Sequence, residues 1–569
     1  MNKARSYHNL QKNGLHWLVD ASYTHLIPGD LLKKIQQPSA HPECRVIKDN
    51  NVRVSMILPL KGKEKHLFVK RYKCRGITDK VKYFFMSSKV SAEWKNMHAF
   101  LDRGISVARP LAKGEHRRYN VLQDSYLFTQ ALVHALPLRD YIAKIQDQSD
   151  SNEAFRSRRE IISAVARVVS AIHEEGFFYR DLHAGNILVD TSDDDTLVIY
   201  PIDFHKVWHF SKMPVWMRVR DLAQLKNSLS SSASDQWRFL KEYTRQSPSF
   251  KTPLKEFAGQ INKKASQLWR VHLRSRTKRC LVESSEFAVR KGTQASLYYR
   301  KTYSAGQIRA LLKQYDTGRS SPHRTVLKET LKEMVSSVTV SSQDGTSKRF
   351  FIKESRFTGL CNRIVRTFTP SRSKRSWIAA RGLQVRGIQT PVPIALIEEK
   401  RLGLLKRTVL ITEFLDDAYE LNDYVLKCFG TKGNLLKDNR KECFIAELAH
   451  QLQKMHSQGI YHADLKSNNI VVTEKGGDAW NFFFVDLDRV AFTRKLSFEQ
   501  MANNLAQINA SIADCISPAD RLKFFRIYSE GTPQRLQRKR YFKRILEIGR
   551  QKNTRPYGVI FSSSINTSF

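Results

Sequence analysis

The sequence of 569 residues has no long hydrophobic run, no paired cysteine motif and comparatively few acidic residues. No stretch approaches the roughly 18 apolar residues that a membrane-spanning helix needs, and the first ten residues lack the apolar core of a secretory signal. The seven cysteines are scattered without a C-x-x-C pair, which is typical of reduced thiols in a cytosolic protein. We therefore expect a cytoplasmic protein whose contact with any membrane is peripheral.

Acidic side chains are far outnumbered by basic ones, 54 to 96, so the formal net charge is +42. Such an excess predicts attraction to polyanions: nucleic acid, an anionic membrane or a phosphorylated glycolipid. A nucleic-acid-binding role would rest on charge alone, because the sequence has no recognisable motif for reading RNA or DNA. We do not expect nucleic acid to be a partner.

One sequence pattern occurs twice at a constant spacing. Asp181 in the segment 179–188 and Asp464 in the segment 462–471 are 283 positions apart. The same spacing relates further pairs, namely Lys70 and Lys353, Trp94 and Trp377, Gly104 and Gly387, His173 and His456, and Asp203 and Asp486. A chain of this length exceeds what one hydrophobic core supports. The sequence therefore predicts a tandem duplication, with one module at 1–265 and a second at 266–569.

Five residues of the first module have the order that phosphoryl transfer requires. The reaction needs a cation on the nucleotide phosphates, a carboxylate to orient the attacking hydroxyl, and oxygen ligands for Mg²⁺. Protein-kinase-like folds supply them in the order Lys, Glu, Asp-x₄-Asn, Asp. Here Lys70 falls on a predicted strand, Glu93 on the next helix, Asp181 and Asn186 in a loop, and Asp203 at a strand end. We predict an α+β fold in which a bilobal kinase-like unit, with a β-rich small lobe and a helical large lobe, occurs twice.

These residues have predicted roles in catalysis and in binding ATP and Mg²⁺. Asp181 would be the catalytic carboxylate that orients the acceptor hydroxyl. Lys70 would neutralise the nucleotide phosphates and would itself be held by Glu93. Asn186 and Asp203 would bind the metal ion.

The second module repeats four of the five residues at identical separations. Asp464 would be its catalytic carboxylate, Lys353 its phosphate-binding cation, and Asn469 and Asp486 its metal ligands. Ser376 stands where the first module has its glutamate. A lysine without its carboxylate partner loses orientation, so the first module is predicted to be the faster catalyst.

Four further residues have no definite role from the sequence. Glu354 or Glu413 could replace the missing carboxylate of the second module, but the sequence does not place either one. His183 and Lys466, inside the two loops, could contact phosphate or could have a structural role.

The usual glycines of a protein kinase are missing around both predicted sites. Neither module has a G-x-G-x-x-G loop before its lysine strand, so the turn that covers the ATP phosphates is not identified. The glycine that usually follows Asp-Phe is His205 in the first module and Asp488 in the second. Each lysine strand is predicted to close a hairpin, across Lys61-Gly62-Lys63 and Gln343-Asp344-Gly345 respectively.

Together these residues resemble the bacterial lipopolysaccharide core kinases, the Kdo and heptose kinase family. The resemblance covers most of both modules. It rests on Trp94, Gly104-Ile105 and Pro110, on Trp377, Gly387-Ile388 and Pro391-Val392-Pro393, on the segment 461–469, and on the segments 202–207 and 485–490.

The resemblance implies a cytoplasmic enzyme, dependent on ATP and Mg²⁺, that phosphorylates a Kdo or heptose hydroxyl of the lipopolysaccharide core. The expected partners are the lipid A–core acceptor and the anionic surface of the inner membrane, to which the protein would bind peripherally. Two alternatives remain open: a protein or small-molecule kinase of the same fold, and a non-catalytic pseudokinase adaptor. The motif Asp181-Leu182-His183 with Gly185-Asn186 also occurs in the wider small-molecule phosphotransferase group, whereas the complete polar set of the first module counts against an adaptor.

Overall fold

The computed structural model of the chain divides into two compact units, Met1–Trp269 and Arg270–Phe569. The boundary lies within helix α8 (Leu254–Lys278), and the division predicted between residues 265 and 266 falls in the same helix. The structure describes residues 6–12, 14–26, 34–37, 41, 43–50, 52–59, 66–74, 76–147, 152–191, 197–229, 231–317, 323–341, 347–430, 435–530 and 537–551. Both predicted hairpin turns, 61–63 and 343–345, lie outside these residues.

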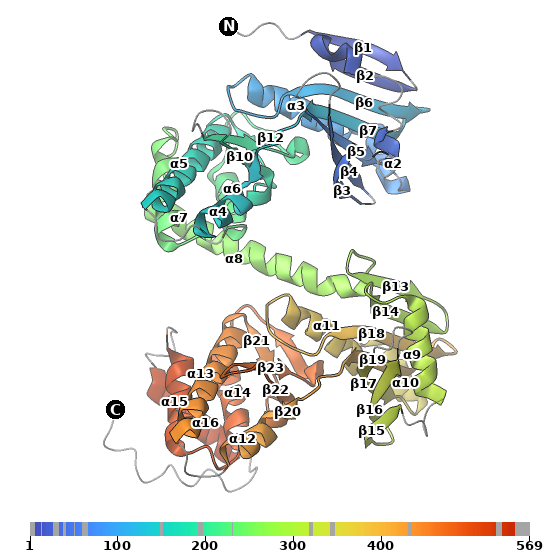
Figure 1. Cartoon of the computed structure of the whole chain (residues 1–569), viewed down its shortest axis with the longest axis vertical. Helices are drawn as coiled ribbons and strands as arrows, with labels where there is room; N and C mark the ends of the chain where they lie inside the picture. Colours follow the sequence, from blue (N-terminus) through green and yellow to red (C-terminus); the bar gives the residue numbers. More distant parts are fainter. Residues whose placement is uncertain are drawn as a thin grey trace. The chain divides into compact units, whose positions relative to one another are not determined.

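The small lobe of the first unit is a seven-stranded antiparallel sheet in the order β1-β2-β6-β7-β5-β4-β3 (Figure 1). Alternation along β5 buries Leu67 and Val69 on one face of the sheet and places Lys70 on the other. Two helices, α2 (Ile77–Phe85) and α3 (Lys89–Leu101), connect β5 to β6. The strands are β1 Tyr7–Lys12, β2 Leu15–Asp20, β3 Arg45–Asp49, β4 Arg53–Pro59, β5 His66–Lys73, β6 Pro110–Arg118 and β7 Val121–Gln130.

The large lobe of the first unit is mainly helical and also contains two short sheets. A three-stranded sheet has the order β11-β10-β8, and β12 pairs with β9. The elements are β8 Leu136–Pro137, α4 Leu138–Asp147, α5 Asn152–Glu174, β9 Phe177–Phe178, β10 Ile187–Asp190, β11 Val198–Pro201, β12 Trp208–His209, α6 Val215–Asn227, α7 Ala233–Arg245 and α8.

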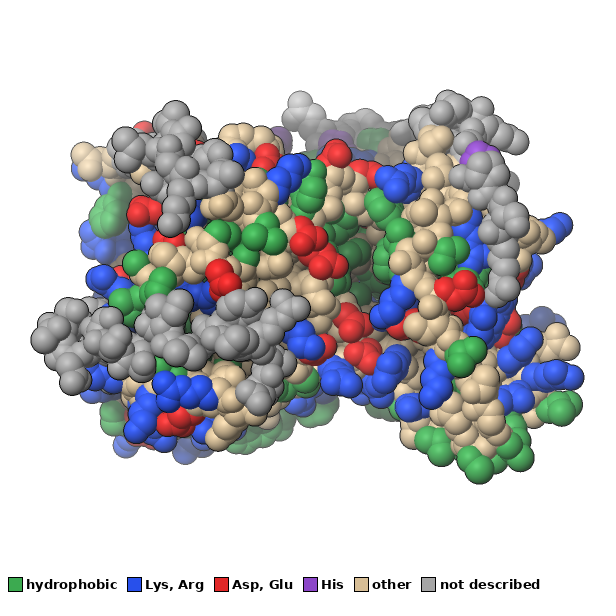
Figure 2. All heavy atoms as spheres, turned by 90° about the horizontal axis from the view of Figure 1, so that it is seen from below, with side chains coloured by type: hydrophobic (Ala, Val, Ile, Leu, Met, Phe, Trp, Pro, Cys, Tyr) green, Lys and Arg blue, Asp and Glu red, His purple; other side chains and the backbone are tan. Residues whose placement is uncertain are grey.

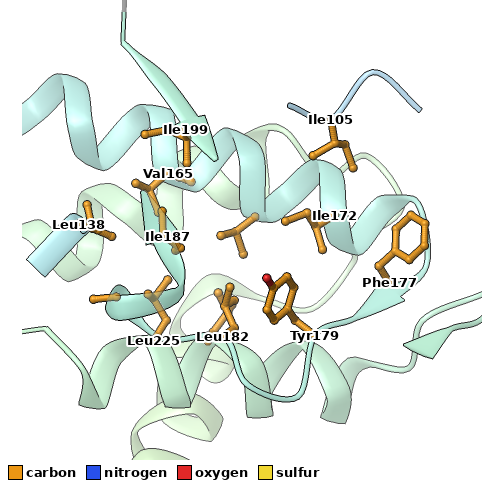
Figure 3. Close-up of a cluster of buried hydrophobic side chains, with 14 of the residues drawn as sticks. Ile105, Leu138, Val165, Ile172, Phe177, Tyr179, Leu182, Ile187, Ile199 and Leu225 are labelled. Atoms are coloured by element: carbon orange, nitrogen blue, oxygen red, sulfur yellow. The ribbon is translucent and has the colours of Figure 1, made fainter. Parts of the chain in front are cut away.

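The core of this lobe lies directly beneath the loop between β9 and β10. Helix α5 contributes a buried stripe at helical spacing that includes Val165 and Ile172. Figure 3 shows Tyr179 and Leu182 from the loop among these side chains. Burial of each such side chain stabilises the lobe by about 1.5–3 kcal/mol. The loop is therefore anchored on both sides of Asp181, which is itself only partly buried.

A glycine ends the long helix ahead of the loop and allows close approach of another segment. Gly176 has φ 77°, and a Cβ atom there would lie 1.9 Å from the carbonyl oxygen of Phe210. Phe210 in turn donates its N–H to the Gly176 carbonyl over 2.9 Å. Gly459 has the same role in the second unit, where a Cβ would meet the Thr493 oxygen at 2.4 Å. Both positions require glycine for conformation and for space.

The second unit repeats this architecture. Its seven-stranded sheet has the order β13-β14-β18-β19-β17-β16-β15, and helix α9 (Ala305–Thr317) lies between β14 and β15 in sequence. The other elements of the small lobe are β13 Phe287–Lys291, β14 Ala295–Arg300, β15 Arg324–Glu329, β16 Glu333–Ser341, β17 Ser347–Arg356, α10 Leu360–Phe368, α11 Arg372–Gln384, β18 Pro393–Arg401 and β19 Leu404–Glu413.

The large lobe of the second unit again combines helices with one three-stranded and one two-stranded sheet. The sheets have the orders β20-β22-β23 and β21-β24. The elements are β20 Tyr419–Glu420, α12 Leu421–Phe429, α13 Leu435–Ser457, β21 Ile460–His462, β22 Ile470–Glu474, β23 Trp480–Phe484, β24 Val490–Phe492, α14 Phe498–Ser511, α15 Pro518–Ser529 and α16 Arg538–Gln551.

The predicted tandem α+β architecture, with a β-rich small lobe and a helical large lobe in each unit, is confirmed. Among the described helices, none is both long and apolar enough to cross a membrane.

Candidate active site

The lysine of the first unit is held between two carboxylates. Lys70 Nζ lies 2.5 Å from Glu93 Oε1 on α3 and 3.5 Å from Asp203 Oδ1. The Tyr72 hydroxyl donates to the other Glu93 oxygen over 3.2 Å. The side chain of Glu93 is only 1 % exposed, so this ion pair is shielded from solvent. The structure thus brings together Lys70, Glu93 and Asp203, as the sequence order predicts.

The position of Glu93 follows from the way α3 begins. The Ser88 hydroxyl accepts a hydrogen bond from the Ser91 N–H over 3.0 Å and caps the helix. Ser88 and Ser91 also donate to Glu115 on β6, which fastens the start of the helix to the sheet. The first turn of α3 therefore has a fixed position above the strand that contains the lysine.

Asp203 is surrounded by cationic and polar groups. Its two oxygens accept hydrogen bonds from Arg53 Nη1 over 3.2 and 3.0 Å, and Oδ1 is 3.0 Å from His205 Nδ1. Burial alone would raise the pKa of Asp203. The hydrogen bond from His205 and the charges of Lys70 and Arg53 outweigh it and hold the pKa well below its usual range. Asp203 is therefore ionised. Its backbone is in the left-handed region, with φ 76°.

Glu93, Asp203 and His205 form a group whose ligand atoms all lie within 4.8 Å of one another. One carboxylate oxygen of this group is already occupied by the Lys70 ammonium at 2.5 Å. A metal ion bound by all three residues would compete with that ammonium, and with the Tyr72 hydroxyl, for the Glu93 carboxylate. We therefore interpret the cluster as an ion-pair network around Lys70 rather than as a three-residue metal site.

A buried carboxylate holds the predicted catalytic loop of the first unit. Asp221 on α6 accepts hydrogen bonds from the backbone N–H of Tyr179 over 2.7 Å and of Arg180 over 3.0 Å. Arg180 has a left-handed backbone at φ 60°, and its guanidinium lies 4.3 Å from the ring centre of Trp208. These contacts fix the chain immediately before Asp181.

The Asp181 carboxylate lies at the surface of the loop between two donors. Lys206 Nζ contacts one oxygen at 2.7 Å, and Gln224 Nε2 donates to the other over 3.0 Å. Asn186 Nδ2 donates to the Asp181 carbonyl over 3.0 Å and so closes the loop. The neighbouring His183 accepts from the Gly185 N–H through Nδ1 over 3.1 Å, which is a capping contact within the loop.

The second unit holds its lysine differently. Lys353 Nζ lies 2.8 Å from Asp486 Oδ1 and 3.1 Å from Glu333 Oε1. Burial alone would lower the pKa of Lys353, but the charges of Asp486 and Glu333 outweigh it and raise the pKa. Glu333 is the first residue of β16, and its side chain is 22 % exposed. The partner of this lysine therefore comes from a neighbouring strand.

Neither glutamate suggested by the sequence is that partner, so both suggestions are wrong. Glu354 follows Lys353 on β17, and alternation points its side chain to the opposite face of the sheet, where it accepts from Tyr315 Oη over 2.8 Å. Glu413 ends β19 opposite Phe350 rather than Lys353. Strand alternation alone argues against Glu354. Glu413 does not reach Lys353 because the register of β17 and β19 places it opposite Phe350.

Strand register explains why the sequence did not reveal Glu333. Lys70 is paired with Ser55 on β4, and Lys353 with Val335 on β16. The residue two positions earlier on the partner strand is Arg53 in the first unit and Glu333 in the second. These two residues are 280 positions apart, not 283. A comparison at the constant spacing therefore misses that they occupy the same place beside the lysine.

The loop of the second unit has the same closure but a different anchor. Asn469 Nδ2 donates to the Asp464 carbonyl over 2.7 Å, and Lys466 Nζ lies 3.0 Å from the Asp464 carboxylate. Asn504 replaces the buried aspartate, and its Nδ2 donates to the His462 carbonyl over 2.6 Å. Gln507 contacts the backbone of the loop on both sides of Asp464. Each predicted catalytic aspartate thus has one lysine beside it, and the two lysines come from different places in the two units.

The predicted metal ligands provide the donor chemistry that a hard divalent cation requires. Asn186 with Asp203, and Asn469 with Asp486, offer amide and carboxylate oxygens. Asn186 and Ile202 are joined by a backbone hydrogen bond of 2.9 Å, and Asn469 and Val485 by one of 3.0 Å. These bonds bring each amide residue next to the segment that ends in the aspartate. The residues present therefore fit Mg²⁺.

Comparison with known proteins gives one family for both units. The model of the lipopolysaccharide kinase (Kdo/WaaP) family matches residues 14–243 and 323–528, one region in each unit. A solved structure of WaaP in complex with acyl carrier protein is 21% identical with a TM-score of 0.34, over 44% of this chain and 99% of that chain. The kinase domain of PknI from Mycobacterium tuberculosis is 11% identical with a TM-score of 0.23, over 39% and 97% respectively. No curated protein sequence matches the chain.

Proposed function

The chain belongs to the lipopolysaccharide kinase (Kdo/WaaP) family and is a kinase, and on this premise we propose its substrate, its residue roles and its site of action. It transfers a phosphoryl group from ATP to a Kdo or heptose hydroxyl of the lipopolysaccharide core at the cytoplasmic face of the inner membrane. The observation that carries this proposal is the arrangement in the first unit, where the Lys70–Glu93–Asp203 cluster and the Asp181–Asn186 loop occur in one site.

Asp181 orients the acceptor. Its carboxylate is held at the loop surface by the buried anchors around it, so the attacking sugar hydroxyl meets a group in a fixed position. The carboxylate accepts the hydrogen of that hydroxyl as the bond to phosphorus forms. Lys206, 2.7 Å from Asp181, is placed to neutralise charge on the transferred phosphoryl group once the acceptor occupies the carboxylate.

Lys70 binds the nucleotide phosphates. Glu93 fixes the direction of its ammonium, and the burial of this pair keeps the lysine from turning towards solvent. Asn186 and Asp203 are the residues that would hold Mg²⁺, which when bound neutralises negative charge on the ATP phosphates. Arg53, at the start of β4, contacts Asp203. The hairpin of β3 and β4 therefore covers the ATP phosphates in place of a glycine-rich loop. In the second unit the turn between β15 and β16 leads to Glu333 in the same way.

The test is transfer of labelled phosphate from ATP to alternative acceptors. Purified protein is incubated with lipopolysaccharide whose core sugars lack phosphate, with a generic protein, and with free Kdo and heptose. We expect label in the lipopolysaccharide core, and none when Asp181→Asn and Asp464→Asn are combined. Label in the generic protein or the free sugars alone would identify a protein or small-molecule kinase instead. No transfer to any acceptor, with ATP bound, would identify an adaptor.

A further inference from the structure

Helix α2 exposes an apolar stripe in the small lobe of the first unit. Ile77, Val81 and Phe85 lie at helical spacing on one side of the helix, and Phe85 is 80 % exposed. The opposite side packs through buried Tyr83 against Cys74 and Leu122. The stripe is therefore not the packing face of the helix.

The tip of the adjacent hairpin extends this apolar surface. Tyr119, between β6 and β7, is almost fully exposed and has a left-handed backbone at φ 49°. Arg117 donates through Nη1 to the Tyr83 carbonyl on α2 over 3.3 Å and to the Asn120 carbonyl at the tip over 3.1 Å. One arginine thus ties the helix to the hairpin tip.

The second unit has the same surface. On α10, Leu360, Ile364 and Phe368 are exposed at helical spacing, with Phe368 83 % exposed, and none of the residues of this helix is buried. Leu402, between β18 and β19, is almost fully exposed with φ 54°. These four positions are each 283 residues from Ile77, Val81, Phe85 and Tyr119. We call the two sets, one in each unit, the helix–hairpin surfaces.

An arginine also ties the helix to the hairpin in the second unit. Arg363 on α10 donates through Nη2 to the Arg401 carbonyl over 3.1 Å and through Nε to the Leu405 carbonyl over 3.3 Å. The Leu405 N–H donates to the Thr367 hydroxyl over 2.8 Å. The two units thus reach the same arrangement with different contacts, which indicates that the exposed surface itself is the common feature.

Cationic side chains border both surfaces. Lys80 and Lys82 flank the stripe of α2, and Arg118 stands beside the Tyr119 ring, with its guanidinium 5.6 Å from the ring centre. Arg363 and Arg366 lie on α10, and Arg401 adjoins Leu402. Figure 2 shows that Lys and Arg side chains are spread widely over the face that it views, among hydrophobic, Asp and Glu side chains. An exposed apolar stripe bordered by cations is the composition of a helix that lies in an anionic lipid interface.

We infer that the two helix–hairpin surfaces dock the protein on an anionic bilayer, with their apolar side chains among the lipid headgroups. This inference rests on the proposed function, in which the acceptor is anchored in a membrane. A bilayer, unlike a folded partner, recognises apolar character and charge rather than shape. The duplicated positions fit this, because side-chain shape changes from Ile77 to Leu360 and from Tyr119 to Leu402 while apolar character is kept.

The first experiment measures binding to vesicles. Full-length protein is sedimented with vesicles of phosphatidylcholine alone and with vesicles that contain anionic phosphatidylglycerol. The variants are Ile77→Ser with Phe85→Ser, Leu360→Ser with Phe368→Ser, and all four together. The control is Val271→Ser, an exposed valine on α8 outside both surfaces. We expect the wild type and the control to bind the anionic vesicles. The fourfold variant should bind them at least about tenfold more weakly.

The second experiment locates the contact through native cysteines. Cys361 lies exposed on α10 and Cys443 lies exposed on α13. An environment-sensitive dye is attached to Cys361 in a Cys443→Ser background, and to Cys443 in a Cys361→Ser background. Anionic vesicles should shift the emission of the dye at Cys361 to shorter wavelength and leave the dye at Cys443 unchanged. Equal shifts at both positions, or none, would overturn the inference.

The outcomes separate this inference from the proposed kinase activity. Phosphorylation of a water-soluble core oligosaccharide without lipid should be the same in the fourfold variant and the wild type. A wild type that phosphorylates this acceptor but does not bind anionic vesicles would overturn the docking inference alone. Undiminished vesicle binding by the fourfold variant would also overturn it, because attachment would then depend on charge elsewhere. Lost activity on the soluble acceptor would show that the surfaces serve the catalytic fold instead.

Discussion

The two units hold equivalent lysines with carboxylates from different elements. In the first unit the partner of Lys70 is Glu93 on a helix, whereas in the second the partner of Lys353 is Glu333 on a strand. At the strand position next to the lysine the charge is reversed, because Arg53 stands where the second unit has Glu333. A carboxylate lost from the helix, at Ser376, is thus balanced by one gained on the strand.

Both units thus keep a glutamate beside the lysine, although it comes from a helix in one unit and from a strand in the other. A lysine ammonium that is largely removed from solvent requires a counter-charge wherever the neighbouring backbone can supply one. The two solutions differ in rigidity. Glu93 is shielded from solvent at the packed start of α3, while Glu333 begins a strand and is partly exposed. We therefore expect the first unit to orient its lysine more firmly and to be the faster catalyst.

The largest expected effect comes from the two aspartates that we propose as catalytic. Asp181→Asn should lower transfer by the first unit by about 10²–10⁴-fold, because the amide cannot accept the proton of the acceptor hydroxyl. Asp464→Asn should lower transfer by the second unit by a similar factor. Assayed separately on the same acceptor, Asp181→Asn should remove most of the total activity. A larger loss from Asp464→Asn would reverse the order of the two units, and comparable losses would mean that both sites work equally. Unchanged thermal unfolding of both variants is the control.

The next comparison removes the charge of the carboxylate partner of each lysine. Glu93→Gln should destabilise the first unit by about 3 kcal/mol, because it removes the nearer and more deeply buried of the two carboxylates that neutralise the Lys70 ammonium. Glu333→Gln should destabilise the second by less than about 1 kcal/mol, since Glu333 is partly exposed and Asp486 remains. Chemical denaturation monitors both. Combining Glu333→Gln with Ser376→Glu should restore activity lost by the second unit, and failure of this rescue would show that Ser376 is not equivalent to Glu93.

A third comparison concerns acid stability. Burial lowers the pKa of His456 to about 4, and its Nε2 faces Asn504 at 3.2 Å. Burial also lowers the pKa of His173, but Asp221 lies 3.5 Å from its Nε2 and opposes the shift. The unfolded chain takes up the proton below its ordinary pKa near 6.5, whereas the folded chain does not. The stability that depends on the neutral imidazole is therefore present above pH 6.5 and is lost as the pH falls towards 4.

This loss should be greater in the second unit. Between pH 7.5 and pH 5 the His456 linkage should cost about 2 kcal/mol of unfolding free energy. Asn504→Asp should reduce this cost, because a carboxylate next to Nε2 stabilises the imidazolium. Thermal unfolding of the full chain at the two pH values provides the measurement. Equal decreases in Tm for the wild type and Asn504→Asp would contradict the assignment.

The smallest expected effect concerns Arg53. This guanidinium donates two hydrogen bonds to the Asp203 carboxylate and so would compete with Mg²⁺ at the metal site that we propose. Arg53→Ala should lower the Mg²⁺ concentration for half-maximal activity of the first unit by about fivefold, which corresponds to about 1 kcal/mol. The titration is performed with the second unit silenced by Asp464→Asn. An unchanged or higher Mg²⁺ requirement would show that Arg53 does not restrict the metal site.

The sequence by itself determined the duplication, the fold class and the order of the polar residues. Asp181 and Asn186, like Asp464 and Asn469, lie in one loop, so their spacing alone brings them together. Local chain geometry over five residues leaves little choice, and this part of the site was predictable. The place of Lys70 beside Glu93 followed from a recognised order of elements in the same way.

Only the tertiary structure decided which groups from distant elements meet at the lysine. The approach of Glu333 to Lys353 depends on the register of two paired strands, and a shift of one residue would turn the side chain to the other face. The approach of Arg53 to Asp203 depends on the closure of the small lobe over a loop 150 positions further along the chain. Register and lobe closure are set by packing over the whole unit. No local pattern around either residue contains that information.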